Sequence, residues 1–236
     1  MYSKILLKLS GESLSSKTDA FDVEILERVA LEIKEIHDQG IDLGIVCGGG
    51  NFVRGRTLSA LGIKRESADT MGMLGTVMNS IALESKLNEL GVKAKAFAAL
   101  EMPQVIAPYR QDEVEECFKN HMVVLFACGV GNPYFSTDTG CALRAIEIRA
   151  DLLLLAKNGV DGVYDSDPDV NADAKKYDVI TYDEMLAKNL KVIDLTAASL
   201  LKDNKMSAYV FDMKEAGNII KVIKGQDIGT KIIVKE

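Results

Sequence analysis

Apolar segments of strand length alternate with amphipathic helical segments along most of this chain. Ile5–Leu9 and Asp42–Cys47 are two such apolar runs, and Asp22–Gln39 between them repeats its apolar residues at helical spacing. Asp22 is placed to cap that helix and Gly40 to end it. Strands that alternate with helices form mostly parallel sheets with both faces covered. The pattern therefore predicts an α/β fold with a mostly parallel central sheet and helices on both faces.

The same alternation continues beyond residue 60. Further strands are predicted at Lys93–Ala98, Met122–Ala127, Asp151–Ala156, Tyr209–Asp212 and Lys231–Val234. Further helices are predicted at Ser67–Leu90, Asp112–Asn120, Asp138–Arg149, Asp183–Asn189, Thr196–Asn204 and Ala216–Lys224. Residues 158–178 are polar and rich in Asp, Asn and Gly. Because no repeat or low-complexity linker divides the chain, we expect one domain over residues 1–236, with functional lobes at roughly 1–150 and 151–236.

Charge and composition exclude several classes of function. A formal net charge of −7 and a pI near 5.1 argue against broad binding to nucleic acid. The apolar run near the N-terminus is too short for a signal peptide, and no apolar stretch reaches the length of a membrane span. We therefore expect a cytoplasmic protein. CxxC spacing is absent, which predicts buried reduced thiols at Cys47, Cys117, Cys128 and Cys141.

The residues that suggest chemistry gather where four predicted strands end. These ends comprise residues 8–12, the triplet Gly48–Gly50, residues 129–138 and residues 157–164. In a doubly wound sheet, ligands bind at the carboxyl ends of the strands. Backbone amides of a glycine triplet can approach an anion closely, and Arg54 lies four residues beyond it. This combination suggests a phosphate site.

Familiar phosphate and nucleophile motifs do not account for these ends. The chain has no GxxxxGK[ST] sequence, and Val53 occupies the position where a dinucleotide-binding motif needs a small residue. His37 and His121 accompany no nucleophile elbow and are expected to be surface or packing residues. These exclusions leave reactions that use no protein nucleophile. Phosphoryl transfer is the leading candidate among them, since this reaction needs mainly positioning and positive charge.

The residue types alone leave some roles open. Lys8 either extends into solvent from a strand end or stabilises a transferring phosphoryl group. Asp69 lies near the start of a predicted helix, where a response to the helix dipole is the simpler explanation than binding of ribose hydroxyls. Thr137 and Asp138 open another helix, where capping is the simpler role.

Taken together, the strand ends resemble the amino-acid kinase family, and within it the bacterial-type UMP kinases. The motifs that carry this resemblance occur in order over essentially the whole chain, at Lys8–Glu12, Gly48–Gly55, Asp69–Met73, Gly131–Asp138, Val160–Tyr164 and Val192–Asp194. The resemblance implies a three-layer αβα sandwich that transfers the γ-phosphoryl group of Mg-ATP to UMP. It also implies a homohexamer built from dimers and inhibition by UTP.

Site residues follow from the same resemblance, position by position. It implies catalytic roles for Lys8, Arg54, Asp138 and Asp194. It implies ATP contacts from Lys8, Leu9, Ser10, Gly11, Gly50, Arg54, Asn158, Tyr164 and Asp167. It implies UMP contacts from Gly49, Asp69, Val130, Gly131, Asn132, Pro133, Tyr134, Phe135, Ser136 and Thr137. Residues 1–150 would form the UMP lobe and 151–236 the ATP lobe. Mg²⁺ would be held mainly by ATP phosphates, with Asp138 nearby and no dedicated protein cage.

The sequence departs from the family pattern at three places. Val130 and Ser136 replace common threonines, and the loop Ser15–Ala20 lacks the glycine found in many relatives, which argues against activation by GTP. Two alternatives remain, a relative that phosphorylates a carboxylate or carbamate, and a non-catalytic binding protein related to molybdenum-storage proteins. Asp69 and the segment Gly131–Phe135 favour a nucleotide acceptor, while Lys8, Asp138 and the segment Asp161–Asp167 favour catalysis.

Overall fold

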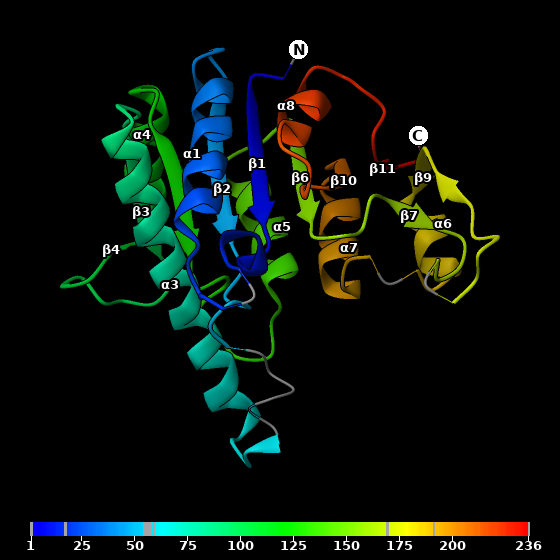
Figure 1. The fold of residues 1–236 in the computed structure, drawn as a ribbon, viewed down its shortest axis with the longest axis horizontal. Coiled ribbons are helices and arrows are strands. Elements are labelled where there is room, and N and C mark those ends of the chain that lie inside the picture. The colour runs from blue at the N-terminus through cyan, green and yellow to red at the C-terminus, as the bar shows by residue number, and fades with distance from the viewer. Residues whose placement is uncertain are drawn as a thin grey trace.

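A central sheet organises the chain in the computed structural model, which describes residues 2–16, 18–53, 58, 60–168, 170–190 and 192–235. Within these residues the sheet has nine strands. They are β1 (Lys4–Leu9), β2 (Asp42–Cys47), β3 (Ala94–Ala98), β4 (Ala107–Pro108), β5 (Val123–Ala127), β6 (Leu152–Lys157), β9 (Val179–Thr181), β10 (Ala208–Asp212) and β11 (Thr230–Ile233). Their order is β4-β3-β5-β2-β1-β6-β10-β11-β9, and only the β10–β11 pair is antiparallel (Figure 1). The predicted continuous, mostly parallel sheet is confirmed.

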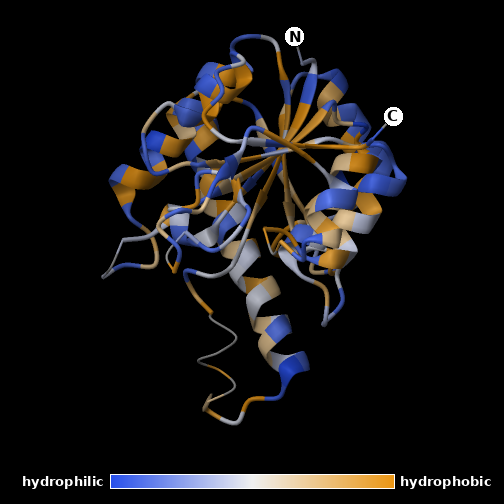
Figure 2. Cartoon of the chain, turned by 90° about the vertical axis from the view of Figure 1, so that its right-hand side faces the viewer, coloured by the Kyte–Doolittle hydropathy of each residue, from blue (hydrophilic) through white to orange (hydrophobic). Residues whose placement is uncertain are grey.

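Helices cover both faces of this sheet. One face packs against α1 (Val23–His37), α3 (Arg65–Glu89) and α8 (Asn218–Ile223). The other packs against α4 (Gln111–Lys119), α5 (Thr137–Glu147), α6 (Tyr182–Ala187) and α7 (Leu195–Asp203). Figure 2 shows the apolar strands at the centre of the molecule and polar residues on the outer helices. The result is a three-layer α/β/α architecture, as expected.

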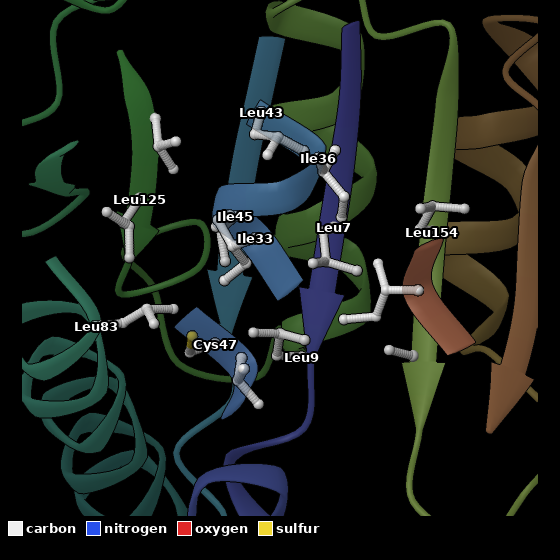
Figure 3. Packing of buried hydrophobic residues seen from close by; sticks show 14 of the residues in the cluster. Leu7, Leu9, Ile33, Ile36, Leu43, Ile45, Cys47, Leu83, Leu125 and Leu154 are labelled. Atoms are coloured by element: carbon white, nitrogen blue, oxygen red, sulfur yellow. The ribbon is translucent and has the colours of Figure 1, made fainter. Parts of the chain in front are cut away.

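Alternation along the strands decides which residues reach which helical layer. In β1, Leu7 and Leu9 pack toward α1, where they meet Ile33 and Ile36 (Figure 3). Leu6 belongs to the core on the opposite face, and Lys8 shares its parity. The strand therefore sends Lys8 toward the α5 layer. The side chain of Leu9 is fully buried, so only its main chain is available for the predicted ATP contact.

Local signals placed most helix ends correctly. Asp22 caps α1 by accepting hydrogen bonds from the amides of Glu24 and Ile25, both at 3.1 Å. The helix ends shortly before Gly40, which has a φ of +82°. The sequence pattern missed the short elements η1 (Gly11–Leu14), β4, β7 (Val163–Tyr164), β8 (Lys176–Tyr177) and β9. Segments of two to four residues are too short to show a hydrophobic period.

The cysteines and histidines have packing roles. All four cysteines are buried, free thiols, as predicted. His37 and His121 stack with ring centroids 4.1 Å apart, and His121 also contacts Asp42 at the first residue of β2. This pair lies at the amino ends of the strands, away from the predicted site. None of the described helices is both long enough and apolar enough to cross a membrane.

Candidate active site

The four strand ends singled out in the sequence belong to four neighbouring strands. These are β5, β2, β1 and β6, which lie side by side in the centre of the sheet (Figure 1). All three pairings among them are parallel, so their carboxyl ends meet at one edge. Chemically distinct residues from distant parts of the sequence therefore converge there, as expected for a ligand site in a doubly wound sheet.

A buried cluster of charges lies at this edge. Nζ of Lys8 is 3.0 Å from Oδ1 of Asp138, and Nζ of Lys157 is 3.5 Å from Oδ2 of the same carboxylate. Lys8 is in register with Leu155, two residues before Lys157, so the two lysines project on the same face of adjacent strands. Asp138 reaches them from the first turn of α5. The side chains of Lys8, Lys157 and Asp138 are only 11%, 18% and 17% exposed.

The surroundings shift the pKa values of all three groups. For Asp138, burial raises the pKa, but the charges of Lys8 and Lys157 outweigh burial and hold it below its ordinary value. For Lys8, burial lowers the pKa, but the neighbouring Asp138 raises it overall. For Lys157, burial and repulsion from Lys8 together lower the pKa. With all three groups charged, the cluster has one excess positive charge, which suits an anion such as phosphate.

The start of α5 is arranged so that Asp138 is not its cap. Ser136 holds the N-cap position, and its Oγ accepts a hydrogen bond from the amide of Thr139 at 3.1 Å. The capping role expected for Thr137 and Asp138 is therefore wrong, and the Asp138 carboxylate faces the lysines instead. Asp194 accepts hydrogen bonds from the hydroxyls of Ser136 and Thr139. Its catalytic role remains a prediction.

Asp194 also caps α7, where it accepts from the amide of Ala197 at 2.9 Å. It thereby joins the starts of two helices, one of which positions Asp138. In this arrangement Asp194 contacts the residues that flank Asp138 in the first turn of α5. Its observed contacts are those of a group that orients the helix terminus.

The glycine triplet is in backbone contact with the end of β1. A Cβ atom on Gly11 would lie 2.5 Å from the carbonyl oxygen of Gly48 and 2.8 Å from the amide nitrogen of Gly50. A Cβ atom on Gly49 would lie 2.4 Å from the carbonyl oxygen of Gly72 in α3. Both positions require glycine because two backbones meet there. Arg54, the predicted cation beyond the triplet, lies outside the described residues.

Most of the predicted acceptor residues surround one cavity of about 240 Å³. The chain after β5 turns over it, with positive φ values at Cys128, Gly129, Gly131 and Tyr134. Asp69 accepts a hydrogen bond from the amide of Tyr134 at 2.8 Å, which ties this turn to α3. Predicted residues that line the cavity are Gly49, Asp69, Val130, Asn132, Phe135, Ser136 and Thr137.

A second cavity, of about 540 Å³, lies on the other side of the charged cluster. It is lined by residues 159–168 and by Lys188, Asn189, Leu190 and Val192. Tyr164 and Asp167 both line it, as the predicted ATP contacts require. Asn158 instead lines a separate polar hollow beside Glu12 and Gly50. The structure thus brings together two of the three predicted contacts of the later segment.

An open hollow of about 870 Å³ connects the two cavities. It is lined by Asp138 and Lys157, and shares Asp69 with the first cavity and Leu190 with the second. The cluster therefore lies between two spaces that suit two ligands. Gly131 and Pro133 do not line the first cavity, and Tyr134 faces the connecting hollow.

Sequence reasoning missed Lys157 as a site residue. A signal was available, because Lys157 ends an otherwise apolar strand just as Lys8 interrupts one near its end. A charged residue in such a position must reach solvent or a partner. Only the neighbouring positions of β1 and β6 in the sheet show that the two lysines share one carboxylate.

Comparisons with known proteins agree with this arrangement. The model of the amino acid kinase family matches residues 3–212. A curated uridylate kinase from Pediococcus pentosaceus is 45% identical over 232 residues, which is 98% of this chain and 96% of that protein.

Solved structures show the same likeness. The UMP kinase from Ureaplasma parvum has 34% identity and a TM-score of 0.95, with 99% of each chain covered. The UMP kinase from Bacillus anthracis has 36% identity and a TM-score of 0.96, with 100% of this chain and 97% of that chain covered. The chain therefore belongs to the amino acid kinase family, and its full-length likeness to these proteins places it in the uridylate kinase branch.

Proposed function

We propose that this chain is a UMP kinase, which reversibly transfers the γ-phosphoryl group of ATP to UMP in pyrimidine nucleotide biosynthesis. The observation that carries this proposal is the cluster of Lys8, Asp138 and Lys157 between two cavities. A reaction between two nucleotides needs two binding spaces that meet at a positively charged point. The family membership and the names of the relatives support the same reaction.

The acceptor would bind in the cavity that is lined by Gly49 and Asp69, and the donor in the cavity that is lined by Tyr164 and Asp167. A phosphate oxygen of UMP attacks the γ-phosphorus, and the bond to the β–γ bridging oxygen breaks with its electron pair passing to ADP. Lys8 and Lys157 would offset the charge of the transferring group. Asp138 holds both ammonium groups in place, so little reorganisation is needed during transfer.

The two proposed lobes are supported by the residues that line each cavity. The first cavity takes all its lining residues from positions 49–137, and the second takes them from positions 159–192. We assign UMP to residues 1–150 and the base and ribose of ATP to residues 151–236. The end of β1 would contact the ATP phosphates across this division.

The described residues fit a magnesium ion that is held mainly by nucleotide phosphates. Mg²⁺ prefers oxygen ligands and commonly keeps several waters beside substrate phosphates. Asp138 is the carboxylate at the point of transfer, and both its oxygens face lysines. No group of three or more metal-binding side chains occurs in the described parts of the chain. Bound with ATP, the ion would neutralise phosphate charge.

An acceptor-panel assay tests the proposed reaction. Purified protein with ATP and magnesium is expected to phosphorylate UMP much faster than CMP, acetylglutamate or aspartate. Comparable rates with another acceptor would contradict the assignment, and nucleotide binding without turnover would favour a binding protein. UTP has the base and ribose of UMP and is expected to inhibit, whereas added GTP is expected to have no effect.

The pH profile tests the role of Lys157. Because burial and Lys8 lower the pKa of Lys157, it loses its proton at a lower pH than an ordinary lysine. We therefore expect kcat to fall at alkaline pH as Lys157 loses its proton. Lys157→Arg is expected to move this fall in the pH profile to higher pH, since arginine stays protonated. The measurement is kcat against pH at saturating substrates. Titration of the substrates affects the parent and Lys157→Arg alike. If kcat falls at the same alkaline pH in both proteins, the role of Lys157 is contradicted.

We also propose that the chain assembles as a homohexamer built from dimers. The N-terminal half of α3 projects from the body of the molecule in both views (Figures 1 and 2). The exposed residues of α3 include an apolar stripe at spacings of three and four, formed by Met71, Leu74, Met78 and Ile81. This spacing is typical of a seam between two helices, and a second copy of α3 would present the same stripe.

Disruption of the stripe tests this assembly. Leu74→Glu combined with Met78→Glu is expected to lower the molar mass in solution by at least half, because two buried carboxylates would face each other in the interface. Light scattering after gel filtration measures the mass. Val23→Glu changes an exposed apolar residue on α1, outside the stripe, and is expected to leave the mass unchanged. An unchanged mass in the double variant would contradict the interface.

A further inference from the structure

The middle of α3 buries a polar side chain that the proposed reaction does not use. Asn79 is a polar residue with no exposed surface, and Val77 and Leu83 on the same helix belong to the apolar core. An amide removed from water costs free energy unless its donors and acceptor find partners. The partners of Asn79 therefore indicate why the helix has an amide at this position.

Those partners lie in the loop that follows β2. Nδ2 of Asn79 donates to the carbonyl oxygen of Gly48 at 2.6 Å and to Oδ1 of Asn51 at 2.9 Å. Its Oδ1 accepts from Nδ2 of Asn51, also at 2.9 Å. Nδ2 of Asn51 in addition donates to the carbonyl oxygen of Ala20 at 2.8 Å. Asn79 thus joins α3 to the glycine triplet and, through Asn51, to the segment after β1.

Neighbouring residues on the same face of α3 contact the loops that follow β5 and β2. Thr76 Oγ1 accepts a hydrogen bond from the amide of Cys128 at 2.7 Å, which fixes the exit of β5. A Cβ atom on Gly75 would lie 3.3 Å from Cα of Gly49, so this turn of the helix lies directly against the triplet. One face of α3 therefore sets the positions of two loops that line the first cavity.

The triplet is in turn fixed relative to the end of β1. The amide of Gly48 donates to the carbonyl oxygen of Leu9 at 2.9 Å, one residue beyond Lys8. Gly11 packs on the carbonyl of Gly48 without space for a side chain. Any displacement of Gly48 would therefore change how the triplet amides stand relative to the Lys8 ammonium.

We propose that Asn79 is a positioning residue for phosphoryl transfer, which acts by orienting the triplet amides toward the reacting phosphates. This inference rests on the proposed function. Amides held in place before the reaction stabilise charge that develops in the transition state, and small misplacements lower the rate strongly. Loss of Asn79 would therefore lower kcat more than it changes either KM.

The test compares Asn79→Ala with Ser80→Ala. Ser80 is the next residue, is also fully buried, and its hydroxyl has no hydrogen-bond partner among the described residues. We expect Asn79→Ala to lower kcat by about tenfold or more, with each KM within about threefold of the parent value. We expect Ser80→Ala to match the parent. Asn79→Asp keeps the volume but loses both donors, and it replaces the alanine variant if that protein does not fold.

Amide hydrogen exchange in the ligand-free protein gives a second readout that needs no activity. Exchange at residues 48–51 is expected to accelerate at least about tenfold in the Asn79 variants, while exchange along α3 stays unchanged. Unchanged exchange in the triplet would overturn the proposal. So would an unchanged kcat with a lowered Tm, which indicates a purely structural role. A parent protein that does not phosphorylate UMP would contradict the proposed function, and exchange would still decide whether Asn79 positions the triplet.

Discussion

Replacement of Lys8 by alanine is expected to lower kcat for UMP phosphorylation by on the order of 10²-fold or more. The ammonium group is held 3.0 Å from Asp138 at the end of β1, between the two proposed nucleotide sites. Because it is held in place before substrates bind, its charge stabilises the transition state without reorganisation. Steady-state kinetics with varied ATP and UMP measure kcat and both KM values.

A matched control separates this effect from a general loss of charge. Lys95 on β3 forms a partly exposed ion pair with Glu113 of α4, outside the cavities described above. Lys95→Ala is expected to keep kcat within about twofold of the parent, since exposed pairs contribute little. An unchanged kcat in Lys8→Ala would remove Lys8 from the mechanism.

Replacement of Asp138 by asparagine is expected to destabilise the protein by about 3–5 kcal/mol, because it leaves two buried lysines without their shared counter-charge. In a chain of this length such a loss lowers Tm by roughly 10 °C. Thermal unfolding of parent and variant measures the change. The same substitution is expected to lower kcat, since both lysines lose the group that positions them.

The loss of stability expected for Asp138→Asn depends on the burial of its ion pairs with the two lysines. Asp183 forms an ion pair with Lys202 on the surface, and its side chain is 54% exposed. Asp183→Asn is therefore expected to cost at most about 1 kcal/mol. Equal effects of the two substitutions would contradict the importance of the buried cluster.

The stability difference between parent and Asp138→Asn should depend on pH in a defined direction. The folded pKa of Asp138 lies below its ordinary value, so the stabilisation is present above the ordinary carboxyl range and is lost as pH falls through the folded pKa. The difference in Tm should therefore narrow on acidification. The difference in Tm should also narrow at alkaline pH. The lowered pKa of Lys157 lets it become neutral there, so the variant no longer buries two positive charges side by side. A constant difference at all pH values would contradict this account.

Much of the fold could be predicted because its signals are local. Asp22, Gly40 and the helical repeat between them define α1, and apolar runs of five or six residues mark the central strands. The ordered motifs also indicated the family. Short elements such as β4 and β9 were missed, because their few residues acquire strand geometry only by pairing with neighbours.

The candidate site was less predictable from single residues. Asp138 was expected to cap α5, yet Ser136 does so and frees the carboxylate for the lysines. Lys157 and Asn79 were not predicted, since a lysine at a strand end and an asparagine within a helix have many ordinary roles. Their contacts lie far away in sequence, 19 positions for Lys157 with Asp138 and 31 for Asn79 with Gly48.

The sequence by itself determined the alternation of strands and helices, the parity that directs Lys8 away from Leu7 and Leu9, and the chemical character of each strand end. These properties depend on hydrophobic period and residue type, which act over a few neighbouring residues. Only the tertiary structure decided that β1 lies between β2 and β6, so that Lys8 and Lys157 share Asp138. Strand order depends on packing between distant segments, and no local pattern specifies it.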